Sequence, residues 1–271
     1  MQSLVDRIAA QGQRVFGVAI VLIGGEHLVC ARMSEQPFPA RFHAIVIPVI
    51  PWIPAHPWLA YLTGVVFVVA GLCILANVRA RGAALVFGAI LLGCDLVMHI
   101  PHMLAAPENW ALRGEVCEML ALSSAAFVLA GTLRRADGSA APWDGALANF
   151  GRVLFGVTLV VFGIDHYLAL QLIASLVPSW LPAHTFFAVF TGTALIAAGI
   201  SIATRWMGVW GGLALGAMFL LWFLTLHLPL VSRTPTNPNQ WSSAFIALGM
   251  CGASWICARA LLLARPARDI T

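Results

Sequence analysis

Apolar residues dominate eight separate stretches of the chain, each about as long as a membrane-crossing helix. About 20 mostly apolar residues suffice to span the hydrocarbon core of a bilayer. Charged residues, prolines and glycines mark the breaks between the stretches. The predicted spans are roughly 13–31, 57–78, 82–103, 111–133, 150–170, 184–204, 207–229 and 241–264. This pattern predicts an all-α, polytopic membrane protein with eight transmembrane helices.

The second half of the chain repeats the first. Residues 52–101 align without a gap on residues 180–229, with 17 identities in 50 positions. An internal repeat of this kind indicates one architecture that is used twice. We therefore expect a four-helix repeat over 1–133, a cytoplasmic linker over 134–149 and a second four-helix repeat over 150–271. The paired residues that carry chemistry are Trp52 and Trp180, His56 and His184, His99 and His227, and, further upstream, Glu26-His27 and Asp165-His166.

Arginine residues predict the orientation of the spans. With the N-terminus in the cytoplasm, 11 of the 15 basic residues lie on the cytoplasmic side and 4 lie outside, as the positive-inside rule requires. Each repeat has an even number of spans, so the two copies insert in parallel, related by an axis along the membrane normal. Both termini are then cytoplasmic. The Pro-broken stretches 42–57 and 172–182 are expected to lie in the outer interface or to dip back.

Composition supports the bilayer and excludes one class of partner. The chain is 61% hydrophobic and 10% charged, against about 25% charged residues in soluble domains. Its formal net charge of +4 follows the membrane topology, so it gives no evidence for nucleic-acid binding.

This topology places all eight histidines in the outer half of the membrane or in the outer loops. Acidic residues gather at the same level. Ionisable groups this close to hydrocarbon are costly, and they usually pair or line a functional cavity. A histidine at a helix end can also lie simply in the headgroup region, and the tryptophans can serve as interface anchors. Repeat one is richer in polar groups, because Asp95 and His102 correspond to Phe223 and Leu230 of repeat two.

Three chemistries fit these residues. A quinone site would use carboxylates and imidazoles for proton transfer, namely Glu26, His27, His99, Asp165, His166 and His227, beside the ring-contacting residues His56, Trp52, His184 and Trp180. A metal site for iron, copper or zinc would use nitrogen and oxygen ligands, from the set His27, His56, Asp95, His99, Glu115 and Glu118. Haem b could be held between two helices by paired histidines such as His27 and His99.

Repeat two resembles the DoxX-like group of small four-helix membrane proteins. The resemblance is carried by residues 155–166, 177–184, 191–192, 197–199 and 226–229, which include Asp165-His166, Trp180 and His184. It implies a bacterial inner-membrane protein. Some members of that family are subunits of a thiosulfate:quinone oxidoreductase or partners in redox and thiol-stress systems.

We therefore expect an inner-membrane redox component, an oxidoreductase subunit in one interpretation, linked to quinone and to a periplasmic or membrane redox partner subunit. Assembly as a homo-oligomer is left open. A metal- or haem-holding protein is the first alternative, and a small-solute transporter or a structural subunit of a membrane complex is the second. Transporters typically place polar groups near the midplane, whereas here they gather at one edge.

Overall fold

The computed structural model describes residues 2–33, 57–134 and 138–264, and this part of the chain is helical throughout, without strands. Eight of its helical segments are long and apolar enough to cross a membrane, which confirms the all-α, polytopic class. The elements are α1 (Gln2–Met33), α2 (Pro57–Leu75), α3 (Ala80–Cys94), η1 (Asp95–His99), α4 (Ile100–Ala105), α5 (Trp110–Thr132), α6 (Asp144–Leu168), α7 (Leu170–Leu176), α8 (His184–Thr204), α9 (Gly208–Trp222), η2 (Phe223–His227), α10 (Leu228–Arg233) and α11 (Pro238–Leu263).

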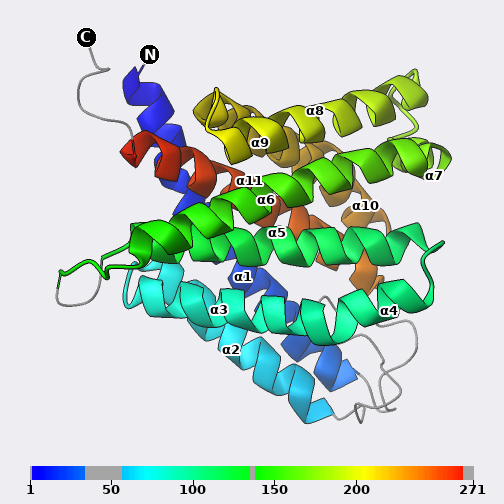
Figure 1. Cartoon of the computed structure of the whole chain (residues 1–271). Coiled ribbons are helices and arrows are strands. Elements are labelled where there is room, and N and C mark those ends of the chain that lie inside the picture. Colours follow the sequence, from blue (N-terminus) through cyan, green and yellow to red (C-terminus); the bar gives the residue numbers. More distant parts are fainter. Residues whose placement is uncertain (1, 34–56, 135–137, 265–271) are drawn as a thin grey trace.

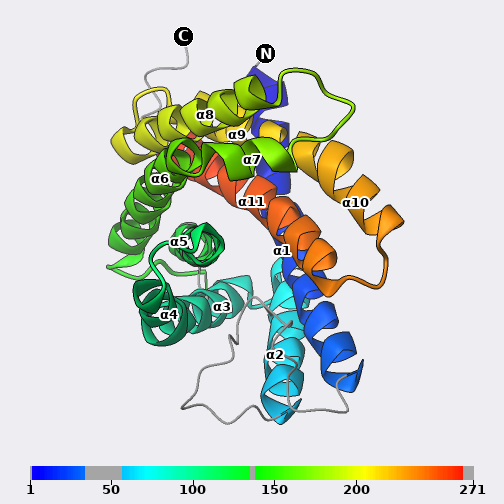
Figure 2. The same cartoon turned by 90° about the vertical axis from the view of Figure 1, so that its right-hand side faces the viewer.

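The helices pack in matched pairs (Figures 1 and 2). α1 packs on α2 as α6 packs on α8, and α3 packs on α5 as α9 packs on α11. The two halves also exchange partners, because α1 packs on α11 while α6 packs on α5. α5 and α11 are the most enclosed spans, 72% and 67% buried, whereas the other six are 22–44% buried. These two helices are therefore the centre of the bundle. The parallel relation of the repeats stays a prediction.

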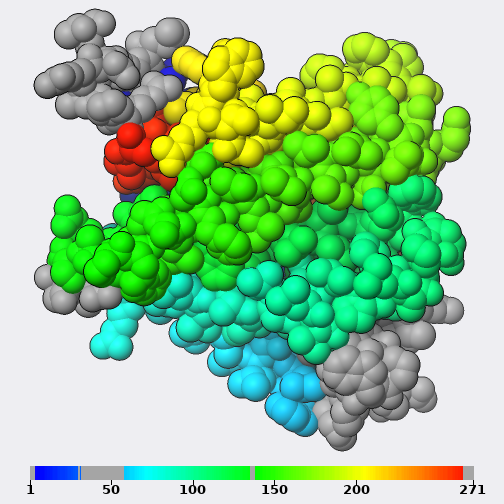
Figure 3. All heavy atoms as spheres, in the orientation of Figure 1, coloured from blue at the N-terminus to red at the C-terminus, as the bar shows by residue number. Residues whose placement is uncertain are grey.

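The two ends of the bundle differ. The start of α1, the end of α5, the start of α6 and the end of α11 lie at one end, and the short helices α4, α7 and α10 lie at the other (Figure 1). On the molecular surface, α6 lies between α3 and α8 along much of the bundle's length (Figure 3). The α4–α7–α10 end corresponds to the predicted outer side, and we call it the site end below.

Close helix crossings depend on glycine. A Cβ atom on Gly24 of α1 would lie 2.8 Å from the carbonyl oxygen of Gly64 on α2. At the corresponding crossing, a Cβ on Gly163 of α6 would lie 2.7 Å from the carbonyl oxygen of Gly192 on α8. Small residues let helix backbones approach closely in membranes, where packing drives association. Gly24 and Gly163 are therefore packing positions at equivalent crossings of the two halves.

A second matched contact closes the opposite end of the same helix pairs. Gln13 of α1 donates through Nε2 to the carbonyl oxygen of Ile74, 2.9 Å away, in the last turn of α2. Arg152 of α6 is 6% exposed and donates to the carbonyl oxygens of Ile202 and Ala203 in the last turn of α8. The last carbonyls of a helix lack intrahelical donors. Arg152 supplies donors to two of them in α8, and Gln13 adds a second donor to the Ile74 carbonyl, which also accepts from the amide of Asn77.

Removing this cap gives a first prediction. Arg152→Ala is expected to lower the free energy of unfolding by about 1–3 kcal/mol, because it leaves buried carbonyls unpaired. Arg152→Gln is expected to lose less, since Gln13 forms the same contact in the first half. Thermal unfolding in detergent measures both variants, with the exposed Arg134→Ala as control. Equal losses for the alanine and glutamine variants would contradict the explanation.

The third span of each half contains a π-helical turn before a proline. In η1 the amide of Ile100 donates to Asp95 O, and in η2 the amide of Leu228 donates to Phe223 O. The wider turn relieves the clash between a proline ring and the preceding helical carbonyl. The predicted end of the third span, near residue 103, agrees with Ala105 to within two residues, whereas the helical path of the seventh span continues to Arg233, beyond the predicted end near residue 229.

Candidate functional site

The first element of the candidate site is a junction of α1, α5 and α11. A Cβ on Gly249 of α11 would lie 3.0 Å from Leu122 of α5 and 3.6 Å from Ala19 of α1. Residues four or seven positions apart share a helix face. Glu26 on α1, Ser242 on α11 and Glu118 on α5 are therefore directed toward the same junction, one or two turns nearer the site end.

A hydrogen bond between Glu26 and Ser242 confirms that these two side chains point toward each other. Ser242 Oγ donates to Glu26 Oε1 across the α1–α11 interface. Glu26 Oε2 is buried and has no hydrogen-bond partner among the described residues. The only hydrogen bond to the carboxyl group of Glu26 from a described residue comes from a neutral hydroxyl, so no cation in the described part of the chain pairs with it.

His27 follows Glu26 and is held rigidly. Its Nδ1 lies 2.8 Å from the carbonyl oxygen of Ile23, and since a carbonyl only accepts, Nδ1 carries the proton. Its ring packs against the edge of Phe67, with centroids 5.8 Å apart. The side chain is 2% exposed, and Nε2 has no partner within the described chain. In the neutral ring this nitrogen presents a free lone pair.

The π-turn η1 supplies two further buried groups. Asp95 is 0% exposed, and neither of its carboxyl oxygens has a hydrogen-bond partner in the described part of the chain. His99 is 3% exposed. Its Nδ1 lies 3.9 Å from Oε2 of Glu115 on α5, and its Nε2 is unpartnered among the described residues. The structure thus brings the predicted His99 and Glu115 together at the η1–α5 contact.

α5 connects this group to the second half. α5 contacts η1 through Glu115 and His99, and it contacts α6 through Arg113 and Asp165. Glu115 and Glu118 lie three residues apart, on adjacent turns of one face. The acidic groups of both halves therefore approach α5 near one level of the bundle.

Asp165 of α6 forms an ion pair with Arg113 of α5. Its Oδ1 accepts from Arg113 Nε on α5 at 3.0 Å and from a second guanidinium nitrogen at 2.5 Å. His166 repeats the geometry of His27, with Nδ1 2.8 Å from the carbonyl oxygen of Phe162. His227 of η2 has an unpartnered Nδ1 among the described residues. The acid of repeat two is ion-paired, while Asp95 is not.

The remaining predicted residues lie apart or outside the described chain. Trp180 is 61% exposed and precedes α8, and His184 begins α8 with a partly exposed side chain. Trp52 and His56 belong to residues 34–56, which lie outside the described residues. Their predicted roles as ring-contacting and ligand residues stay predictions.

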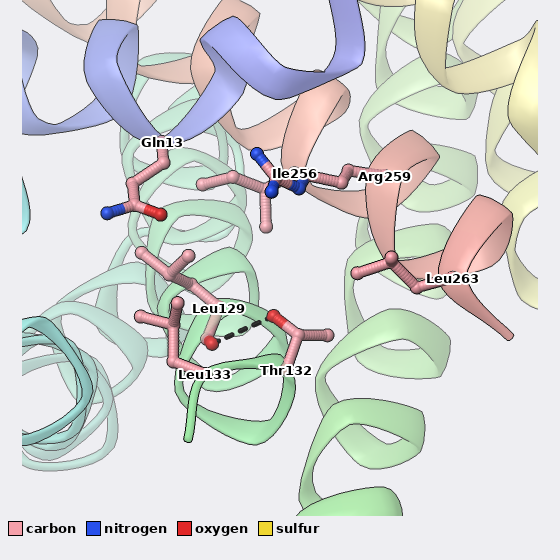
Figure 4. Close-up of a pocket in the computed structure, with 7 residues that line it drawn as sticks. All are labelled: Gln13, Leu129, Thr132, Leu133, Ile256, Arg259 and Leu263. Atoms are coloured by element: carbon pink, nitrogen blue, oxygen red, sulfur yellow. Dashed lines mark hydrogen bonds between the residues drawn. The ribbon is translucent and has the colours of Figure 1, made fainter. Parts of the chain in front are cut away.

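A pocket lies at the opposite end of the bundle, between the inner ends of α1, α5 and α11 (Figure 4). It is lined by Gln13, Leu129, Thr132, Leu133, Ile256, Arg259 and Leu263. None of the predicted site residues is among them. Since the amide of Gln13 is already bonded to α2, we interpret this pocket as a feature of helix packing.

In the described part of the chain, no three His, Cys, Asp or Glu side chains are arranged to hold a metal ion. Two contact residues were missed by the sequence prediction of the site, namely Ser242 and Arg113. The sequence does show that α5 and α11 are equivalent, because the helix-capping residues Asn109 and Asn237 lie 128 residues apart and extend the repeat into these two helices. That alignment does not say which helix each residue faces.

The fold and these buried polar groups define a polytopic all-helical membrane protein with ionisable side chains collected at one end of its core. No family model matches the chain, and no characterised protein or solved structure is significantly similar to it. The DoxX-like resemblance therefore stays an expectation from the sequence.

Proposed function

We propose that this chain is a membrane redox component that exchanges protons with a quinone at the site end, through the carboxyl and imidazole groups of the first repeat. Asp95 carries the proposal, because it is fully buried and neither oxygen has a partner among the described residues. An unpaired charge in such surroundings is costly. Asp95 is therefore stable when it holds a proton or meets a ligand that donates a hydrogen bond.

The neighbouring groups suit the same reaction. Reduction of a quinone to a quinol takes up two electrons and two protons, and both oxygens become hydroxyls. His99 and Glu115 lie next to each other and can pass protons between the bundle core and its end. Positioned carboxyl and imidazole groups are the side chains most used for such transfers. The electrons would come from a redox partner subunit.

Location and partners follow the sequence expectation. The eight apolar spans indicate a multi-pass protein in contact with a lipid bilayer. We propose the bacterial inner membrane, with cytoplasmic termini, from the arginine distribution. The start of α1 and the end of α11 lie at the end opposite α4, α7 and α10 (Figure 1), as this topology requires.

The test is made on the purified full-length protein. Extraction is expected to yield bound quinone, and addition of a short-chain quinone in proteoliposomes is expected to support oxidation of an added reduced thiol or sulfur donor when the partner subunit is present. His27→Ala is expected to lower this turnover strongly. Protein that carries no quinone, shows no quinone-dependent turnover and is unaffected by His27→Ala would overturn the proposal.

Haem or metal ligation at His27 is the second candidate. Ligating histidines typically donate their other ring N–H to a carbonyl or carboxylate, and the His27–Ile23 bond has this form. His99 offers a second buried Nε2 without a partner among the described residues. A Soret band, or a stoichiometric metal that is lost in His27→Ala, would favour this candidate over quinone exchange.

A further inference from the structure

We infer that the chain has one proton-exchanging carboxyl site, on the first-repeat side of α5, and that Arg113 closes the corresponding site of the second repeat by pairing with Asp165. The inference rests on the proposed function only for the identity of the ligand that exchanges protons with the site. The distribution of charged residues, on which the inference is based, does not depend on that ligand.

The ion pair is the first observation. Asp165 is 6% exposed, and Arg113 donates to its Oδ1 from Nε and from a second nitrogen. The guanidinium also lies over the Trp110 ring, 5.2 Å from its centroid. Charge-assisted bonds from arginine with two donors are strong and directional. Asp165 is thus paired with a guanidinium, a group that keeps its positive charge.

Among the described residues, the corresponding acid of repeat one has no cation as its hydrogen-bond partner. Glu26 aligns with Asp165 in the repeat, but its partner across the interface is the neutral Ser242. Trp241 of α11 stands where α5 has Arg113, 128 residues earlier. The indole of Trp241 donates to the carbonyl oxygen of Pro235, 2.9 Å away. The two interfaces share one geometry, and a single arginine distinguishes their electrostatics.

Asp95 extends this difference. Its counterpart in repeat two is Phe223, so the π-turn η2 carries no carboxyl group. Removing one partner of the Arg113–Asp165 pair would leave the buried carboxyl of Asp165 without its cation, which is unfavourable. Asp165 therefore stays paired with Arg113, while Glu26 and Asp95, which have no hydrogen bond to a charged group among the described residues, can take up and release a proton.

A hydrophobic carbodiimide tests the inference directly. N,N′-dicyclohexylcarbodiimide reacts with a protonated carboxyl group: the acid proton moves to a carbodiimide nitrogen, the carboxyl oxygen bonds to the central carbon, and the adduct rearranges to a stable N-acylurea. Peptide mass spectrometry of the full-length protein locates the adducts. We expect modification of Asp95 and Glu26, with Asp165 modified at least about tenfold more slowly, because its carboxyl group is paired with Arg113.

Two variants isolate the role of Arg113. Arg113→Gln keeps hydrogen-bond donors but removes the charge, and it is expected to make Asp165 reactive. Arg113→Lys keeps a positive charge, and it is expected to leave Asp165 protected. The inference would be overturned if Asp165 of the wild-type protein were labelled as fast as Asp95. It would also be overturned if the labelling rate of Asp165 were unchanged in a folded Arg113→Gln protein.

The outcomes separate this inference from the proposed function. The expected labelling without any quinone activity would refute only the quinone. Quinone activity in a protein whose Asp165 labels as fast as Asp95 would refute only the single site.

Discussion

Asp95→Asn is expected to lower quinone-dependent turnover by about 100-fold or more, the range seen when a positioned proton donor or acceptor is removed. Asparagine has nearly the same shape as aspartic acid but cannot exchange a proton. The variant is expected to fold and to keep its thermal stability, because neither oxygen of Asp95 has a partner to lose among the described residues. Turnover in proteoliposomes and the unfolding temperature in detergent measure the two effects.

The control for this prediction is a carboxyl group outside the site. Glu108 is exposed, in the connection between α4 and α5, and Glu108→Gln is expected to leave turnover unchanged. Loss of activity with retained stability distinguishes a functional acid from a structural one. An Asp95→Asn protein with wild-type turnover would show that Asp95 is dispensable, and a protein that unfolds would show that its carboxyl group stabilises the core.

Gly24→Ala and Gly25→Ala, at neighbouring positions of α1, are expected to change stability in opposite directions. A Cβ on Gly24 would lie 2.7 Å from the amide nitrogen of Val68 and 2.8 Å from the carbonyl oxygen of Gly64. These are backbone atoms, so α1 and α2 must separate, at a cost of about 1–3 kcal/mol. A Cβ on Gly25 meets no atom within 4 Å, and alanine gains about 0.5–1 kcal/mol over glycine within a helix.

Unfolding in mixed micelles with increasing denaturing detergent compares the two variants in one assay. Gly163→Ala, at the equivalent crossing of α6 and α8, is expected to repeat the loss. If Gly24→Ala were as stable as Gly25→Ala, the close approach of α1 and α2 would be wrong. His27 lies one turn from Gly24, so a separated crossing is also expected to disturb the His27–Phe67 contact.

The two halves illustrate how duplication can be followed by specialisation. The glycine crossings and the caps by Gln13 and Arg152 correspond between the repeats. The polar groups of the site end do not correspond, because Asp95 aligns with Phe223 and Arg113 aligns with Trp241. Packing positions kept their form in both copies, while the ionisable residues give the two halves different chemistry.

The sequence by itself determined the eight spans, the repeat and the accumulation of histidines and acids toward one end. Hydropathy and residue spacing are local properties of the sequence. Because a membrane-spanning helix needs apolar residues along its length, these properties indicate the spans directly. One boundary was placed too early, near residue 229, because the π-turn η2 that accommodates Pro229 leaves no simple periodic signal.

Only the tertiary structure decided which helices are neighbours. α1 packs on α11 and α5 packs on α6, so the halves are joined through their first and fourth spans. This exchange puts Ser242 against Glu26 and Arg113 against Asp165. Every lipid-compatible helix surface is similarly apolar, so the choice of partner depends on the fit of small residues and a few polar contacts. That fit is a property of two surfaces together, and neither helix carries it alone.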